Sequence, residues 1–410
     1  MLPADSARLG VVPFFRRHFR IFGALYFFLL ALVVYCYSNN GQYMFYNYYT
    51  HLADAFLHGS LSIQNPPPWL SELAHVGGKH YVRFGVMPGV VLMPVVALFG
   101  MATNEAWASI FLGAVGVSLM WTILGKVVEK TSIRALGTTL FAFGTVYWFH
   151  TAYGNSWYFA HVVTSFFLLL GINEVLKENP NGALTGLCLG CASLSRYTVI
   201  LAFPFFAGML WWKTRSLKKT AFFLGFLFIP LLLNFAYNFV RFGSFTETGY
   251  ALVESQSGVL PFDASKGLFH WSYLPFNFSV YFLKGPDWLG QFPWFQPSQL
   301  GMSLFLTTPA VFYALETLRT ENMTYWKTRE GVLVILCWVS VVLLTAPSLF
   351  YFYVGWKEFG WRYSLDFMPF LILLTCLGWK EKLDPAKISL VALSILVNLW
   401  GVVYWRMMNW

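Results

Sequence analysis

The sequence predicts an all-α integral membrane protein in which residues 1–410 form a single polytopic membrane domain. Hydrophobic residues make up 57% of the chain and charged residues only 11%, a balance that a water-soluble domain would not expose. Aromatic residues reach 20%, which is typical of a chain with many membrane interfaces. The net charge of +9 does not indicate nucleic-acid binding, because the basic residues are scattered between apolar runs.

About eleven apolar runs are long enough, or nearly long enough, to cross a bilayer as helices. They cover residues 21–38, 105–127, 134–150, 157–176, 183–194, 197–212, 220–240, 299–318, 331–352, 361–379 and 388–405. The two runs on either side of Arg196 are short, and they are expected to pair as a hairpin. A further run, 86–100, is interrupted by proline and, at about 15 residues, is too short to cross comfortably.

The basic residues indicate how this short run is placed. If 86–100 crosses the membrane, every later basic cluster changes side relative to Arg16, Arg17 and Arg20. If it lies on the outer surface or dips into it, most of the 27 lysines and arginines fall on the side of the amino terminus. Positive charge is retained on the cytoplasmic side, so we expect an interfacial or re-entrant segment, a cytoplasmic amino terminus and an external carboxy terminus.

Two external segments carry most of the chain outside the membrane. Residues 39–103 form the first external loop, with interfacial helices. Residues 241–298 are rich in glycine, proline and aromatic residues, which predicts a folded lid rather than a flexible linker. The amino-terminal arginines precede a full-length span without a cleavage pattern, and they indicate a signal anchor.

Several charged residues are expected on the external side, near the ends of the spans. Arg196, Arg362 and Asp366 each lie at a span edge, where a charge is costly unless it is paired or faces water. Arg362 and Asp366 are four residues apart, so a purely structural ion pair on one helix is an equal alternative. Arginine offers phosphate a planar fork and lysine a point charge, which makes Lys79, Arg83, Arg196 and Arg362 candidate phosphate ligands.

Four segments carry a resemblance to a known family. They are His51-Leu-Ala-Asp-Ala-Phe-Leu-His-Gly59, Gly78-Lys-His-Tyr-Val-Arg-Phe-Gly-Val-Met-Pro-Gly-Val-Val-Leu-Met-Pro94, Asn238-Phe-Val-Arg-Phe-Gly-Ser-Phe-Thr-Glu-Thr-Gly-Tyr250 and Gly360-Trp-Arg-Tyr-Ser-Leu-Asp-Phe-Met-Pro-Phe370. In this order they resemble membrane glycosyltransferases of the GT-C type. The chain is similar to the bacterial protein O-mannosyltransferase and aminoarabinose transferase group, glycosyltransferase family 39.

This resemblance implies a GT-C-like fold and an enzyme of the bacterial cytoplasmic membrane. Such an enzyme takes a sugar from a polyprenyl-phosphate donor and transfers it, with inversion, to a lipid, glycan or protein acceptor on the outer face. The expected partners are the donor lipid, the bilayer and the acceptor. The resemblance implies no metal requirement, and the sequence has no compact carboxylate or histidine cluster, although Asp54 and Glu72 can be imagined to share an ion.

The family also implies a first-loop carboxylate that acts as general base on the acceptor hydroxyl. Residues 43–47, where such an acid usually stands, contain none, so Asp54 is assigned this role. The further candidates for substrate contacts are His80, Tyr81, Asn155, His161, Arg241, Glu247, Tyr363 and Asp366. Structural alternatives exist for several: Asp54 can be a surface acid, His161 a packing group, and Glu247 a partner of Arg241.

Two other classes of protein fit the same spans. A transporter or flippase of a lipid-linked sugar would have matched broken helices in two halves and charges near the middle of the membrane. The charges here lie at span ends on one face and the halves do not match, which favours an enzyme. A non-catalytic scaffold with a GT-C-like fold would lack the acid, and the carboxylate-free segment 43–47 keeps that alternative open.

Overall fold

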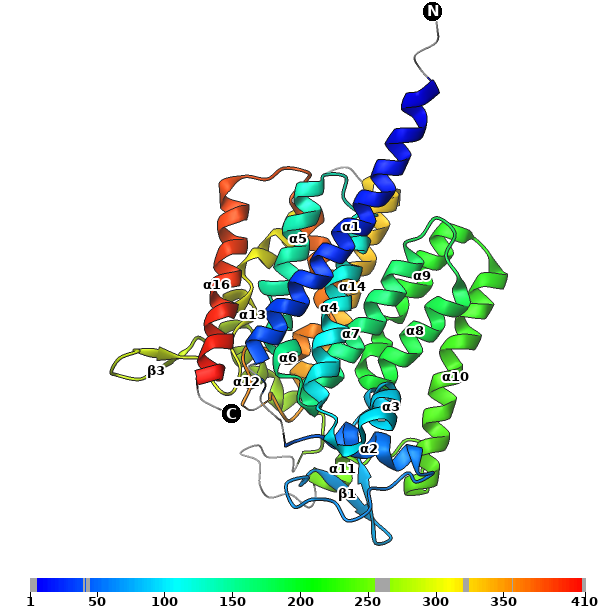
Figure 1. The fold of residues 1–410 in the computed structure, drawn as a ribbon, viewed down its shortest axis with the longest axis vertical. Coiled ribbons are helices and arrows are strands. Elements are labelled where there is room, and N and C mark those ends of the chain that lie inside the picture. Colours follow the sequence, from blue (N-terminus) through cyan, green and yellow to red (C-terminus); the bar gives the residue numbers. More distant parts are fainter. Residues whose placement is uncertain are drawn as a thin grey trace, which may run out of the picture.

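The structure, a computed structural model, describes residues 6–39, 41, 45–254, 266–319, 324–355 and 357–407, with side chains from residue 19 onward apart from those of residues 253 and 254. Most of the described chain is helical (Figure 1). Within the described residues, six helices are long and apolar enough to cross a membrane. They are α1 (Ser6–Asn39, apolar from Phe19), α4 (Glu105–Leu124), α7 (Ser156–Val175), α10 (Leu217–Phe242), α14 (Arg329–Phe350) and α16 (Pro385–Met407). The expectation of a helical, membrane-embedded protein is therefore confirmed.

The remaining five expected spans are shorter or interrupted helices. They consist of α5 (Thr131–Phe143) with α6 (Tyr147–Tyr153), α8 (Gly182–Ser195), η2 (Tyr197–Ala202) with α9 (Phe203–Thr214), α13 (Leu304–Thr307) with η5 (Pro309–Leu318), and η7 (Arg362–Asp366) with α15 (Met368–Gly378). The breaks have local causes: α5 ends at Gly144, and proline stands in the first turn of α9, η5 and α15. The number of crossings stays a prediction, because helix length alone does not decide it.

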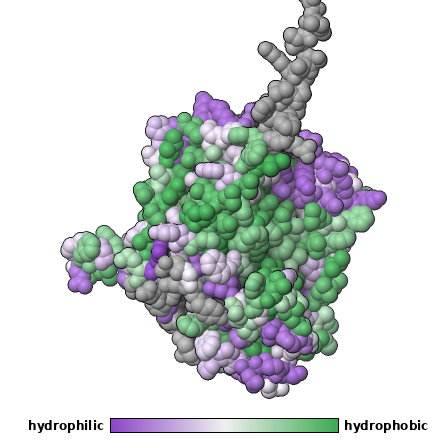
Figure 2. All heavy atoms as spheres, in the orientation of Figure 1, coloured by the Kyte–Doolittle hydropathy of each residue, from purple (hydrophilic) through white to green (hydrophobic). Residues whose placement is uncertain are grey.

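The surface of the molecule is divided by polarity along the direction of the long helices. Figure 2 shows hydrophobic residues around the middle of the visible face and hydrophilic residues gathered toward both ends. Helix α1 contributes strongly exposed apolar side chains such as Phe22 and Leu29, which in water would be unfavourable. This band is the surface that a bilayer would cover.

The segment expected to be the first external loop is folded, and its elements are α2 (Tyr48–Leu57), the antiparallel strands β1 (Leu73–Val76) and β2 (Lys79–Val82), and α3 (Met87–Phe99). Most of the run 86–100 forms α3. At 13 residues this helix is about 20 Å long, less than the thickness of the hydrocarbon core of a bilayer. It packs along α2, where Gly89 lies against the Leu52 side chain. The segment is thus a short helix packed on α2, and its interfacial placement stays a prediction.

The buried carboxylate of Glu105 fixes this loop to the helices beneath it. One oxygen accepts hydrogen bonds from the backbone N–H groups of Tyr49 and Thr50, at 2.8 and 2.9 Å. The other accepts from the Ser156 hydroxyl at 2.7 Å. These N–H groups belong to the first turn of α2, which has no partner for them within the helix. Glu105 therefore joins the beginnings of α2, α4 and α7.

The expected lid, residues 241–298, contains several small elements, and its positions 255–265 lie outside the described residues. The described elements are α11 (Tyr250–Glu254), η3 (Trp271–Tyr273), α12 (Leu274–Phe278), the π-helical turn η4 (Ser279–Leu283), and the strands β3 (Asp287–Trp288) and β4 (Phe295–Gln296). The hairpin of β3 and β4 projects sideways from the helices (Figure 1), and its rings Trp288 and Trp294 stack on each other. A further short turn, η1 (Gly100–Ala102), follows α3, and η6 (Tyr325–Lys327) precedes α14.

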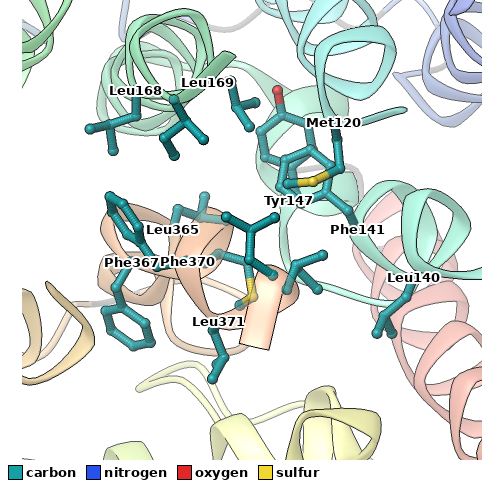
Figure 3. Packing of buried hydrophobic residues seen from close by; sticks show 14 of the residues in the cluster. Met120, Leu140, Phe141, Tyr147, Leu168, Leu169, Leu365, Phe367, Phe370 and Leu371 are labelled. Atoms are coloured by element: carbon teal, nitrogen blue, oxygen red, sulfur yellow. The ribbon is translucent and has the colours of Figure 1, made fainter. Parts of the chain in front are cut away.

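The core lies between α4, α5, α7 and α15. Figure 3 shows Leu168 and Leu169 of α7 facing Phe370 and Leu371 of α15, with Phe141 of α5 beside them. All of these side chains are buried. The core sets the position of η7, the turn that leads into α15, and so it also positions the polar residues described next.

Candidate functional site

A buried ionic cluster joins three segments that are far apart in the sequence. Asp366, at the end of η7, accepts hydrogen bonds from Arg196 Nε through both carboxylate oxygens, at 2.9 and 2.8 Å. His161 Nδ1 lies 3.2 Å from the same carboxylate. Because an ionised carboxylate only accepts, His161 carries its proton on Nδ1 in this contact. The structure thus brings three predicted site residues together.

Arg196 is held in place by this contact but keeps donors free. It ends α8 in an extended backbone conformation, with φ −143° and ψ 109°, so its side chain leaves the helix axis. Only Nε meets Asp366, and both Nη groups lack a hydrogen-bond partner among the residues that the structure describes. The side chain is 21% exposed, in contrast to 3% for Asp366. Arg196 can therefore bind an anion without losing its carboxylate.

Arg362 forms the second half of the cluster. Its Nε lies 3.1 Å from Oε2 of the fully buried Glu358, and its Nη2 donates to the Tyr363 hydroxyl at 3.3 Å. The guanidinium carbons of Arg196 and Arg362 lie 4.9 and 5.2 Å from the centre of the Tyr363 ring. Two cations thus lie close to the same aromatic ring, and guanidinium groups held in this way can bind a phosphate group.

The alternative of an ion pair between Arg362 and Asp366 does not occur, for a geometric reason. Residues 362–366 form a 3₁₀ turn rather than an α-helix. With about three residues per turn, positions four apart point in different directions. Arg362 pairs instead with Glu358, and Asp366 with Arg196. A buried stack of Trp361 on Tyr281, with ring centres 4.2 Å apart, holds the start of this turn.

The first external loop reaches the cluster through Tyr250 of α11. Arg83 pairs with Glu72 and lies over the Tyr250 ring at 5.1 Å. Burial raises the pKa of the Tyr250 hydroxyl, while the charges of Arg83 and then Arg196 oppose that rise. Tyr250 therefore lies between the loop arginine and the cluster.

A second contact between loop and cluster is made by backbone. A Cβ on Gly85 would be 2.3 Å from the carbonyl oxygen of Ser195, the residue before Arg196. Such a distance is far inside van der Waals contact, so glycine permits this close approach. The loop therefore rests directly on the end of α8 that carries Arg196.

An apolar groove begins two residues beyond Arg196. Its volume is about 610 Å³, and it runs between η2 and α14. The lining comprises Thr198, Leu201, Leu343, Ala346, Pro347 and Phe350, with Phe269, His270 and Trp271 at the lid. Among the described residues, no charged side chain lines this groove. Arg196 itself does not line the groove, but Thr198, two residues further along the chain, does.

Asp54 lies apart from these contacts in the described structure. It is on α2, its side chain is 39% exposed, and its carboxylate lies 3.5 Å from His58 Nδ1, one helical turn away. It also interacts electrostatically with His51, whose pKa is lowered by burial. The general-base role of Asp54 stays a prediction, and its contacts also fit the alternative of a surface acid.

The other loop candidates are distributed over the hairpin and the end of α10. Lys79 is exposed on β2, and the His80 ring contacts His75 across the hairpin. Tyr81 packs edge-on against Phe242. These three residues are consecutive on β2, so His80 points to the opposite face from Lys79 and Tyr81, and no described contact joins them to Arg196.

Three remaining candidates have structural contacts. Asn155 caps α7 by accepting a hydrogen bond from Tyr158 N at 3.1 Å. Arg241 is buried and donates to Val82 O and the Asn238 side chain, each at 2.7 Å. Glu247 accepts from Gly249 N at 2.6 Å, so it holds a turn rather than pairing with Arg241. Arg241 thus fastens α10 to the first loop.

Two carboxylates at the cluster were not chosen as site residues from the sequence. Glu72 pairs with Arg83 and influences Tyr250 and Tyr353 electrostatically. Glu358 is fully buried, and burial raises its pKa to about 7, against the opposing charge of Arg362. A carboxyl group with that pKa can hold or release a proton near neutral pH. The sequence signal for Glu358 was its position four residues before Arg362.

The described residues contain no group of three or more histidine, cysteine or acidic side chains that could hold a metal ion. The expectation of a metal-free reaction stays a prediction. Comparison of the sequence with models of known protein families gives no match, and no curated protein matches it either.

Proposed function

We propose that this protein is a membrane glycosyltransferase that takes a sugar from a polyprenyl-phosphate donor and transfers it, with inversion, to an acceptor on the outer face. The observation that carries the proposal is the arginine pair flanking Tyr363, placed beside an apolar groove that begins just after Arg196. A lipid phosphate has the matching two parts, an anionic head and a hydrocarbon tail. The resemblance of the four sequence segments to the GT-C type supports the same chemistry.

In this proposal the two arginines stabilise the phosphate as it leaves. Breaking the bond between the anomeric carbon and the phosphate oxygen builds negative charge on that phosphate, and fixed guanidinium groups offset it without reorganisation. Asp366 is a positioning residue, because it orients Arg196 through Nε and leaves the Nη groups for the ligand. The Tyr363 ring lies within cation–π distance of both guanidinium groups and so helps to hold them near each other.

The acceptor hydroxyl needs a base on the face opposite the leaving phosphate. Asp54 is the first candidate, because a first-loop acid is what the resemblance implies. Glu72 is the second, because it lies with Arg83 beside Tyr250. The two are distinguished by isosteric replacement, Asp54→Asn and Glu72→Gln. The base variant is expected to lose transfer while keeping donor binding.

The orientation of the chain follows from its charges. The connections at the end of α4, α7, α9 and η5 carry basic residues, and contacts such as Lys126 to Asn173 and Lys213 to Lys177 place them at one end. Arg196 lies at the opposite end of α8. Retention of basic residues in the cytoplasm then directs the arginine pair outward, in a bacterial cytoplasmic membrane.

Donor binding can be measured without knowing the acceptor. Undecaprenyl phosphate is titrated into the detergent-solubilised protein, with Arg196→Gln compared with Arg319→Gln, a charge-matched control whose side chain is 75% exposed. Loss of a hydrogen-bonded cation is expected to weaken binding about 10- to 100-fold for Arg196→Gln. The control is expected to bind as the wild type does. Equal affinity in all three proteins would remove the arginine pair from the proposal.

Turnover is then tested in proteoliposomes with polyprenyl-phosphate mannose and an envelope extract as acceptor. Release of polyprenyl phosphate that depends on protein and acceptor supports transfer. Movement of the sugar lipid across the bilayer without its cleavage would instead support the flippase alternative. Binding without either activity would favour the scaffold. Unchanged transfer by Asp54→Asn together with its loss in Glu72→Gln would move the base to Glu72.

A further inference from the structure

A second hollow, separate from the apolar groove, lies at the end of the molecule opposite the arginine pair. Its volume is about 1080 Å³, and it opens between α1, the turn after α4, the start of α5 and the start of α14. Four cations, Arg20, Lys126, Arg134 and Arg329, line it, against two carboxylates, those of Glu129 and Glu330. The hollow is therefore positively charged, and the proposed glycosyl transfer does not use it.

Arg134 forms the buried floor of this hollow. The residue is 6% exposed, its Nε donates to Trp121 O at 2.7 Å, and its guanidinium lies 3.6 Å from the Trp121 ring centre. Gly125 makes room for it, because a Cβ there would be 2.6 Å from the guanidinium carbon. No carboxylate of a described residue forms an ion pair with Arg134. Burying a cation without a counter-charge costs free energy unless an anion binds beside it.

Two more cations, Lys177 and Lys213, lie close enough to the lining residues Lys126 and Arg329 to act on them electrostatically. Lys126 Nζ donates to Asn173 Oδ1 at 2.7 Å, and Lys177 is among the charges that act on it. Arg329 is the like charge that acts on Lys213. Glu330 is exposed and accepts a hydrogen bond from Tyr325 at 2.9 Å, so its carboxylate offsets little of the positive charge inside the hollow. An anion would relieve repulsion among several side chains at once.

Apolar side chains also line the hollow, on α1 and α14, which carry Arg20 and Arg329, and on α15. Phe19, Leu333 and Leu377 share the hollow with the four cations. Beyond it, α1 presents Phe22 and Leu25, which are 64% and 49% exposed in the band a bilayer would cover. A headgroup in the hollow would therefore have its hydrocarbon chains directed along α1. A free inorganic anion would contact the cations but would leave the apolar side chains without a ligand.

We propose that this hollow binds the phosphodiester headgroup of an anionic glycerophospholipid from the leaflet at the amino-terminal end of α1. The phosphate lies between Arg20, Arg134 and Arg329, and the acyl chains follow the apolar face of α1. The lipid thereby connects α1 to α14. Basic recesses between membrane helices are a known type of site for anionic headgroups.

The test compares two double variants with matched loss of charge. Arg20→Gln with Arg329→Gln removes two exposed cations from the hollow and keeps the buried Arg134, whose loss would endanger folding. Lys218→Gln with Lys327→Gln removes two exposed charges from the same end of the molecule but outside the hollow. Circular dichroism and size-exclusion chromatography establish that both variants fold.

Binding of phosphatidylglycerol, phosphatidylcholine and inorganic phosphate is measured by native mass spectrometry on the detergent-solubilised full chain. Wild type is expected to retain one phosphatidylglycerol in preference to phosphatidylcholine. The hollow variant is expected to bind phosphatidylglycerol about 30-fold more weakly, because each lost cation contributes about fivefold. The control variant is expected to bind as wild type does.

Three results would overturn the proposal. Equal weakening in both double variants would show a diffuse effect of surface charge. Equal retention of the two lipids by wild type would show that the hollow does not select anionic headgroups. Binding of inorganic phosphate as tight as that of phosphatidylglycerol, and lost in the hollow variant, would replace the lipid by a soluble anion.

Discussion

Replacing Asp366 by alanine removes the carboxylate that both Arg196 and His161 contact. Asp366 and His161 are almost completely buried, with side chains 3% and 1% exposed, whereas Arg196 is 21% exposed. The replacement leaves a cation and an imidazole N–H without their acceptor. The cluster is therefore expected to lose stability rather than to adapt.

The size of this loss can be worked out from the two donors. A hydrogen bond to a charged group contributes about 1.5–3 kcal/mol, so two donors give about 3–6 kcal/mol. Water reaches the part of Arg196 that is exposed and recovers some of its contribution. We expect Asp366→Ala to cost about 3–4 kcal/mol, within the range for breaking a buried ion pair. Asp366→Asn keeps an acceptor oxygen and is expected to cost about half as much.

The assay is equilibrium unfolding by sodium dodecyl sulfate in mixed micelles, followed by circular dichroism. A double-mutant cycle of Asp366→Asn with Arg196→Gln isolates the pair from the other effects of each change. We expect a coupling free energy of about 2 kcal/mol, given direct contact between the two side chains. Additive effects within about 0.5 kcal/mol would refute the contact as a source of stability.

Three further predictions concern other parts of the molecule. The pKa of Glu358 is raised from 4.5 to about 7, so the folded protein favours the protonated carboxyl group. The free energy of unfolding is therefore expected to fall as the pH rises from 4.5 to 7. The loss is about 3 kcal/mol, and Glu358→Gln is expected to flatten that slope in unfolding measured from pH 4.5 to 8. Gly85→Ala is expected to cost about 1–3 kcal/mol, measured in the same unfolding assay, because its Cβ would collide with Ser195 O. Glu105→Ala leaves two buried N–H groups of α2 without an acceptor and is expected to cost about 2–5 kcal/mol, with faster amide exchange confined first to α2.

Each of these predictions has a control or a contrary outcome. Parallel pH profiles for wild type and Glu358→Gln would show that another group produces the slope. Gly225→Ala, where a Cβ meets no atom within 4 Å, is expected to leave stability unchanged or slightly raised, and an equal loss at both glycines would argue against the collision. Unchanged amide exchange in α2 of Glu105→Ala would mean that other contacts hold its first turn.

Much of the architecture could be predicted from local properties of the sequence. The six full-length helices coincide closely with apolar runs, because hydropathy acts over the same stretch of chain that forms the helix. The short run 86–100 was predicted not to cross the membrane because length is also a local property, and the helix that forms there, α3, has 13 residues. The broken helices were harder to predict, since α5 and α6 join within one continuous apolar run and only Gly144 marks the break.

The polar cluster was predictable only in part. Arg196, Arg362 and Asp366 were chosen because charges at span edges are costly. In the structure both arginines lie near the Tyr363 ring, and Asp366 accepts a hydrogen bond from Arg196. Their partners were not predictable, since an i to i+4 rule assumes an α-helix and residues 362–366 form a 3₁₀ turn. The same limit applies to Glu72, whose direction depends on the fold of the first loop.

The sequence by itself determined the class of protein, the segments that reach the bilayer and the end at which basic residues gather, because each depends on composition along a short stretch. The tertiary structure alone decided which acid meets which arginine. Asp366 holds Arg196 across 170 positions of chain, and Glu358, rather than Asp366, holds Arg362. Such pairings depend on side-chain direction and on helices packed from distant segments, which no local pattern encodes.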